Sequence, residues 1–260
     1  MWEEPVISGT NGSGTVFFCG CNLKCVYCQN YKISRGGTGL FVSEDQLIDL
    51  FLKLETDGAH NINLVTPSPY IKLLPVLLAK AKKIIKIPIV YNTNAFESVE
   101  DLKNLKGLVD IYLPDFKYVD NAVAQKYSGV SNYFEVASAA IAEMRRQQPQ
   151  DVFENGIMTR GVIVRHLILP SNTHDSFKVL DEIARIDKDI YVSLMSQYFP
   201  TQNVKNFPEL SRRITKAEYN AVKEHFFSIG LHNGFQQDPS SAIEDYTPDF
   251  DLSQLKKQID

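Results

Sequence analysis

Short apolar runs alternate with longer amphipathic stretches along this chain. The short runs are rich in β-branched and aromatic residues and predict strands at Gly14–Phe18, Asn61–Val65, Ile87–Asn92, Val109–Pro114, Gly161–Leu169 and Ile190–Ser196. The longer stretches repeat apolar residues at helical spacing and predict helices at Ser43–Thr56, Ile71–Ile85, Ser98–Leu105, Tyr133–Gln148, Ser176–Ile186 and Lys216–Ser228. Such alternation is typical of an α/β fold with a parallel sheet. Right-handed crossovers would curl the six units into a partial (β/α)6 barrel, with its active groups at the carboxyl ends of the strands.

Composition agrees with one enzyme-sized domain. The chain has 260 residues, 44% of them hydrophobic, which is enough for one large core. We predict a barrel domain over residues 1–237 and an acidic tail over residues 238–260 that is either packed over the barrel mouth or mobile. Lys and Arg total 27 against 31 Asp and Glu, and long basic runs are absent, so no nucleic-acid partner is expected. No stretch approaches the roughly 20 apolar residues of a membrane span, so no membrane association is expected either.

All four cysteines lie within ten residues, at positions 19, 21, 25 and 28. This clustering excludes a long-range disulfide framework within one chain. Three of them form Cys21-x3-Cys25-x2-Cys28 on a loop just after the first predicted strand. A cubane [4Fe-4S] cluster takes one thiolate per iron, so three ligands from one loop leave the fourth iron open. Clustered free thiols and the acidic start, which lacks a signal-peptide core, indicate the reducing cytoplasm.

Two other interpretations of the cysteines remain open at this point. Structural zinc sites usually draw paired ligands from separated parts of the chain, and no second pair exists here. Cys19 as a fourth ligand would close the cluster and make the protein a non-catalytic electron carrier. Alternation along the strand places the Cys19 side chain on the same face as that of Phe17. The plainer interpretation of Cys19 is a small buried thiol.

Polar residues at other strand ends supply candidate site groups. Asp115 and Lys117 follow the fourth strand, two residues apart, so both point to the side shared with Ile111 and Leu113. The alternative for this acid and base is a surface ion pair, which contributes little. In the fifth strand Arg165 is charged among apolar residues and therefore needs a partner, for which a cofactor carboxylate would serve.

Four segments of the chain together resemble one known family. They are residues 12–31 with the cysteine loop, 58–67, 110–118 and 164–170. They are similar to the radical S-adenosylmethionine superfamily, in particular the group related to pyruvate formate-lyase activating enzymes. The resemblance spans roughly residues 2–237 and implies a partial barrel of the radical S-adenosylmethionine type.

The resemblance implies roles for particular residues. Cys21, Cys25 and Cys28 would ligate the [4Fe-4S] cluster, and the open iron would hold the amino and carboxylate groups of S-adenosyl-L-methionine. The residues that match cofactor contacts of the family are Tyr27 near the adenine, Asn92 and Thr93 after the third strand, the Asp115 and Lys117 pair, and Arg165. The Gly-Gly-Glu that binds the methionine amino group in activating enzymes is absent here. Thr66 and backbone carbonyls are left for that contact.

The function implied is that of an oxidoreductase that works anaerobically. A reductant such as flavodoxin or ferredoxin would reduce the cluster, and reductive cleavage of the cofactor would give a 5′-deoxyadenosyl radical that abstracts hydrogen from a substrate. The substrate is unidentified, either a small molecule or a partner protein such as a glycyl radical enzyme. A third interpretation, group transfer without a radical, leaves the cysteine loop unexplained.

Overall fold

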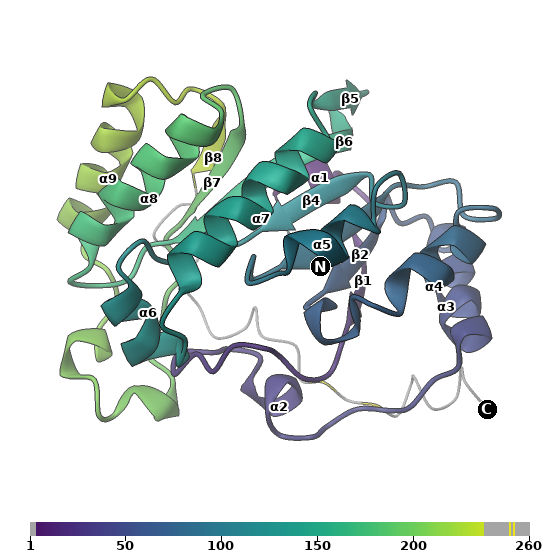
Figure 1. Ribbon diagram of the computed structural model, residues 1–260, viewed down its shortest axis with the longest axis horizontal. Coiled ribbons are helices and arrows are strands. Elements are labelled where there is room, and N and C mark those ends of the chain that lie inside the picture. Colours follow the sequence, from purple (N-terminus) through teal and green to yellow (C-terminus); the bar gives the residue numbers. More distant parts are fainter. Residues whose placement is uncertain (1–3, 237–249, 251, 253–260) are drawn as a thin grey trace.

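The structure is a computed structural model that describes residues 4–236, 250 and 252. Its centre is an eight-stranded sheet in the order β1-β2-β3-β4-β6-β7-β8, and β5 pairs with β6 outside this path. Figure 1 shows helices packed around this sheet. All neighbours are parallel except β5 and β6. The strands are β1 Gly14–Phe17, β2 Ile62–Val65, β3 Ile89–Thr93, β4 Ile111–Pro114, β5 Val152–Glu154, β6 Ile157–Leu167, β7 Tyr191–Met195 and β8 Gly234–Gln236. The sheet does not close, so the predicted α/β partial barrel is confirmed.

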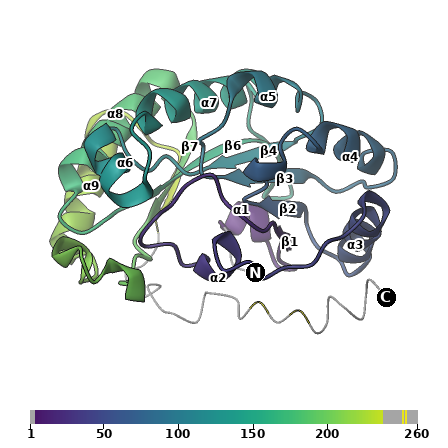
Figure 2. The ribbon, with the colours of Figure 1, turned by 60° about the horizontal axis from the view of Figure 1, so that its bottom comes forward.

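Helices lie on both sides of this curved sheet, most of them on its outer face (Figure 2). They are α1 Pro5–Ser8, α2 Tyr31–Ser34, α3 Glu44–Thr56, α4 Leu74–Ala81, α5 Val99–Lys103, α6 Asn121–Ser128, α7 Tyr133–Gln147, α8 Thr173–Ile186 and α9 Lys216–Ser228. Short 3-10 helices lie at Ser68–Tyr70, Gln202–Val204 and Pro208–Leu210. Figure 2 shows α3 to α9 in an arc over the outer face, with α1 and α2 on the inner side. Within the described residues, the helices are all too short or too polar to cross a membrane.

The six predicted strands and six predicted helices are all present, but five elements were missed. These are α1, α2, α6, β5 and β8, each of eight residues or fewer. The β5 and β6 hairpin lies between the predicted helix that ends at Gln148 and the predicted strand that begins at Gly161, where no element was predicted. Asn155 and Gly156 turn it with φ angles of 51° and 82°, and an Asn-Gly pair is the usual sequence signal of such a turn. The hairpin lies at the amino end of β6, away from the cysteine loop.

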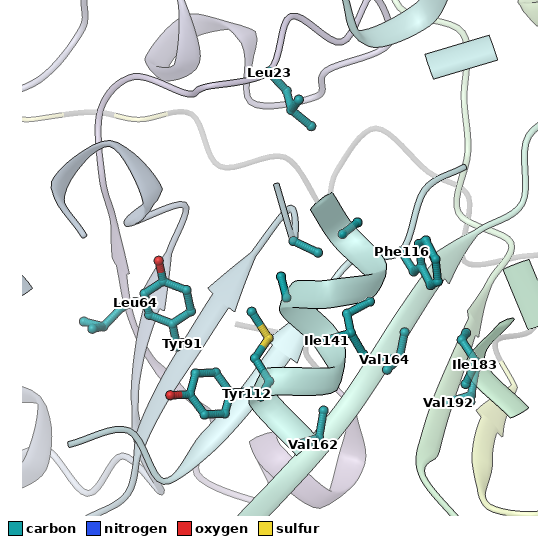
Figure 3. Packing of buried hydrophobic residues seen from close by; sticks show 14 of the residues in the cluster. Leu23, Leu64, Tyr91, Tyr112, Phe116, Ile141, Val162, Val164, Ile183 and Val192 are labelled. Carbon is teal, nitrogen blue, oxygen red and sulfur yellow. The ribbon is translucent and has the colours of Figure 1, made fainter. Parts of the chain in front are cut away.

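Apolar side chains pack on both faces of the sheet. Figure 3 shows the larger cluster, where Tyr112, Val162 and Val164 point from the strands toward Ile141 of α7. A smaller cluster on the inner face joins Ile7 of α1 with residues of β3, β4 and β6. The side-chain amide of Asn61 donates to the carbonyl of Ile7 at 2.9 Å and fixes α1 there. Asn92 of β3 and Arg165 of β6 lie near the other, carboxyl ends of their strands.

The predicted tail lies almost entirely outside the described residues. Only Phe250 and Leu252 of the predicted tail are described. The Phe250 ring meets the Phe17 ring edge to face, with centroids 5.2 Å apart. The division between a barrel domain and an acidic tail therefore stays a prediction.

Candidate functional site

The cysteine loop follows β1 and is held against the last turn of α6. The backbone N–H of Lys24 donates to the Ser128 carbonyl at 2.9 Å, and that of Val26 donates to the Tyr127 carbonyl at 2.8 Å. These two bonds flank Cys25 on both sides. The loop therefore has a fixed conformation around its middle thiol.

The thiols of Cys21, Cys25 and Cys28 share one electrostatic environment. Burial raises the pKa of the Cys25 thiol to about 11, and the charges of Cys28 and Cys21 add to that rise. Burial also raises the pKa of Cys21, again with a contribution from Cys28. The ammonium of Lys117 opposes both shifts. Three thiols that repel one another as anions beside a cation are suited to binding a positively charged metal group.

Each of these thiols also has a polar neighbour. Cys21 Sγ accepts from the Asn94 side chain at 3.4 Å, Cys25 Sγ lies 3.0 Å from Ser128 Oγ, and Cys28 Sγ lies 3.4 Å from Ser34 Oγ. Within the described part of the chain, no three histidine, cysteine or carboxylate side chains are placed to hold a single metal ion. A cubane cluster binds each thiolate to its own iron, whereas a structural zinc site places four ligands on one ion.

Cys19 lies in different surroundings. Its thiol donates to the Thr38 carbonyl at 3.2 Å, and a Cβ added to Gly39 would lie only 2.1 Å from its sulfur. Burial raises its pKa. This thiol is packed against the loop before α3 and already has a hydrogen-bond acceptor.

A charged cluster lies beside the cysteine loop at the carboxyl ends of β3, β4 and β6. Arg165 Nε donates to Asp115 Oδ1 at 2.9 Å, and Arg165 Nη2 donates to Asn92 Oδ1 at 2.6 Å. Lys117 Nζ donates to the other oxygen of Asp115 at 2.8 Å. The side chains of Lys117, Arg165 and Asp115 are 13%, 14% and 20% exposed, so this is not a surface ion pair.

Strand pairing explains why these residues meet. Asp115 forms a parallel bridge with Arg165, because β4 and β6 are neighbours in the sheet although β5 lies between them in sequence. Burial alone would raise the pKa of Asp115, but Arg165 and Lys117 outweigh it and hold the pKa below its usual value. Asp115 is therefore an anion between two cations, and its bond to Lys117 agrees with the prediction that both side chains point to one side.

Asn94 connects the charged cluster to the cysteines, and the sequence argument did not single it out. It follows Asn92 by two residues, bonds Cys21, and donates to Asn22 Oδ1 at 2.7 Å. Asn22 in turn donates to the Phe96 carbonyl at 2.6 Å. The two-residue period from Asn92 was the signal that could have identified it.

The other predicted cofactor contacts are not gathered in the charged cluster. The Thr93 hydroxyl lies on the opposite face of β3 from Asn92 and bonds Glu97. Tyr27 is buried, with 6% of its surface exposed, and its hydroxyl is hydrogen-bonded to the hydroxyl of Tyr118. Thr66 has a φ of 56°, in the left-handed region, and its backbone N–H donates to the Asn92 carbonyl at 2.9 Å. Their roles at a cofactor stay predictions.

Glu97 fixes the loops after β2 and β3 from the helix side. Its Oε1 accepts hydrogen bonds from Ser68 at 2.5 Å, Thr93 at 2.5 Å and Tyr91 at 3.0 Å, and the residue is 4% exposed. Burial raises its pKa despite the three hydroxyl donors, which lower it. The Glu97 carboxyl therefore joins the loop after β2, through Ser68, to the end of β3, through Thr93. The loop after β2 is the segment that replaces the Gly-Gly-Glu of activating enzymes.

We expect Glu97→Gln to flatten part of the pH dependence of stability. Because the folded pKa is raised above 4.5, the contribution of Glu97 is full below the unfolded pKa and is lost as pH rises through the folded pKa. Each unit of that shift is worth about 1.4 kcal/mol. Urea unfolding from pH 4 to pH 7 should show wild type losing free energy relative to Glu97→Gln. Glu100→Gln, at an exposed glutamate, is the control, and parallel curves for wild type and Glu97→Gln would contradict the expectation.

Together the fold and site define a class, that of partial α/β barrels with a thiol-rich loop and a charged cluster at the carboxyl ends of their strands. The chain belongs to the radical SAM superfamily, whose family model matches residues 15–183. Members of this superfamily catalyse radical reactions, and membership implies a [4Fe-4S] cluster and S-adenosyl-L-methionine as cofactors. The predicted family is confirmed, while the activating-enzyme subgroup stays a prediction.

Relatives and solved structures resemble the chain to different extents. An uncharacterized protein of Methanocaldococcus jannaschii is 32% identical over 231 residues, and the chain spans 64% of its length. That alignment covers 86% of this chain. SuiB of Streptococcus suis, bound to the precursor peptide SuiA, superposes with a TM-score of 0.59 at 11% identity, over 86% of this chain and 48% of that one. Methylornithine synthase, PylB, superposes with a TM-score of 0.59 at 15% identity, over 82% of this chain and 62% of that one. These two likenesses show the fold alone.

Proposed function

We propose that this protein is a radical enzyme in which Cys21, Cys25 and Cys28 hold three irons of a [4Fe-4S] cluster and leave the fourth for S-adenosyl-L-methionine. When bound, the cluster supplies one-electron reductive cleavage of the cofactor to methionine and a 5′-deoxyadenosyl radical. The observation that carries this proposal is that one short loop brings the three thiols within electrostatic reach of one another and places two of them, Cys21 and Cys25, beside the Lys117 ammonium. Cys19 is not in this set, because its thiol is bonded to the Thr38 carbonyl.

The charged cluster gives this site its polarity. Arg165 and Lys117 carry two positive charges against the single negative charge of Asp115. One excess positive charge in a mostly buried place favours an anionic group of a ligand, and the carboxylate of the cofactor is such a group. Asn92 orients the Arg165 guanidinium through its side-chain oxygen. These side chains would therefore bind and orient the cofactor next to the cysteine loop.

The finer assignment we propose is an activating-enzyme-like reaction on a backbone glycine of a partner protein. Its support is the resemblance of residues 12–31 and 110–118 to that group. The solved structure of SuiB with its precursor peptide is an example of this fold with a peptide bound. Flavodoxin or ferredoxin is the proposed reductant, and the four free thiols agree with a reducing compartment. A small molecule is the alternative substrate.

The test is anaerobic reconstitution with iron and sulfide, reduction by dithionite, and electron paramagnetic resonance with and without S-adenosyl-L-methionine. We expect a reduced cubane signal that shifts on adding the cofactor, together with 5′-deoxyadenosine. An unshifted signal without this product would support the closed cluster and the electron carrier instead. Formation of S-adenosylhomocysteine in place of 5′-deoxyadenosine would support group transfer.

A further inference from the structure

A chain of three buried hydroxyl groups leads to the middle thiol of the cysteine loop. Resting on the proposed function, we propose that Ser128, Tyr118 and Tyr27 form a one-directional hydrogen-bond chain that ends on Cys25 and raises the reduction potential of the cluster. Ser128 Oγ lies 3.0 Å from Cys25 Sγ, and the Tyr118 hydroxyl lies 2.9 Å from Ser128 Oγ. The Tyr27 hydroxyl is hydrogen-bonded to that of Tyr118.

Binding of iron fixes the direction of this chain. In the free thiol either Cys25 or Ser128 can donate, but a thiolate on iron has no proton to give. Ser128 must then donate to the sulfur, and its oxygen can only accept from Tyr118. Tyr118 has thereby used its single proton, so Tyr27 must donate to Tyr118. Every donor in the chain consequently points toward the cluster.

Burial strengthens the effect of these groups. Ser128, Tyr118 and Tyr27 are 0%, 1% and 6% exposed. The ordinary pKa of a tyrosine hydroxyl is about 10, so a tyrosine is a donor at neutral pH. In a low-dielectric interior, successive hydrogen bonds polarise one another. The chain therefore acts on Cys25 as a stronger donor than a single serine in contact with water.

The effect on the cluster follows from charge. One-electron reduction adds negative charge to a group whose potential depends on hydrogen bonds to its sulfurs. Donors aimed at Cys25 stabilise the reduced state more than the oxidised state and so raise the potential. The two other ligand thiols have longer contacts, each 3.4 Å, from Asn94 and from Ser34. Ser128 is therefore a positioning and tuning residue with the shortest contact to a predicted cluster thiol.

The experiment is a redox titration of the reconstituted full chain, followed by electron paramagnetic resonance without S-adenosyl-L-methionine. In Ser128→Ala we expect the ratio of reduced to oxidised cluster at a fixed potential to fall about tenfold, a shift of about 59 mV for a one-electron couple. Tyr118→Phe should shift the potential in the same direction by less, because Ser128 still donates. The hydrogen bond from the Lys24 backbone N–H goes to the backbone carbonyl of Ser128, so Ser128→Ala retains it.

The matched control is Tyr127→Phe. It removes a hydroxyl from the neighbouring residue of α6, one that bonds Glu209 at 2.6 Å instead of a cysteine, and it should leave the potential unchanged. An unchanged potential in Ser128→Ala with full cluster content overturns the inference. If Ser128→Ala takes up no cluster, an unchanged potential in Tyr118→Phe overturns it. A wild-type cluster that ignores S-adenosyl-L-methionine contradicts the proposed function alone, whereas a wild type without any cluster contradicts both.

Discussion

Replacing Cys25 by alanine is expected to abolish both cluster binding and 5′-deoxyadenosine formation, whereas replacing Cys19 by alanine leaves both intact. Cys25 is clamped by two backbone bonds against α6 and shares its charge environment with Cys21, Cys28 and Lys117. A cubane that has only two thiolates from one loop loses a ligand to one of its irons. The Cys19 thiol instead donates to the Thr38 carbonyl, so its loss removes one hydrogen bond. Iron and sulfide content per chain and product chromatography measure the difference.

The two variants control for each other, since both remove one half-buried thiol from the same ten-residue segment. Circular dichroism and urea unfolding of the metal-free chains should show similar folds for both. If Cys19→Ala loses the cluster while Cys25→Ala keeps it, the assignment of the ligands is wrong. If both lose it and the wild type does not respond to S-adenosyl-L-methionine, the four-thiolate electron carrier is the better description.

The fold could be predicted from the sequence because its signals are local. Apolar runs, helical spacing and the two-residue period of a strand identified six of the eight described strands and placed Asp115 and Lys117 on one side. The same period also requires Asn92 and Thr93 to face opposite ways, a consequence that grouping both as cofactor contacts overlooked. Thr93 accordingly bonds Glu97 on the helix side.

Contacts between distant segments could not be predicted in this way. Ser128 meets Cys25 across 103 positions of sequence, through a short helix that carries no strong apolar stripe. Arg165 meets Asp115 because β4 and β6 are adjacent in the sheet, which is a property of the topology. A charged residue in an apolar strand indicates that a partner is needed, but the sequence does not identify that partner. The hydrogen-bonding surroundings of the site therefore required the structure.

Replacing Asp115 by alanine is expected to lower the free energy of unfolding by about 3–5 kcal/mol and to weaken S-adenosyl-L-methionine binding, because Arg165 and Lys117 lose the carboxylate that positions them. The reason is that Arg165 and Lys117, 14% and 13% exposed, would face each other without the anion that separates them. Urea unfolding measures the first effect, and equilibrium dialysis of the reconstituted protein measures the second. Glu100→Ala is the control, because its pair with Lys103 leaves the two side chains 80% and 48% exposed and should cost less than about 1 kcal/mol.

The pH dependence of a second variant, Asp115→Asn, gives an independent check with a defined sign. The folded pKa of Asp115 is held below its usual value, so its contribution to stability is present above the unfolded pKa and is lost as pH falls through the folded pKa. Below about pH 4, wild type should therefore lose unfolding free energy more steeply than Asp115→Asn, which has no charge to lose. If the free energies of unfolding of the two proteins fall in parallel at acid pH, Asp115 does not carry this charge in the folded chain.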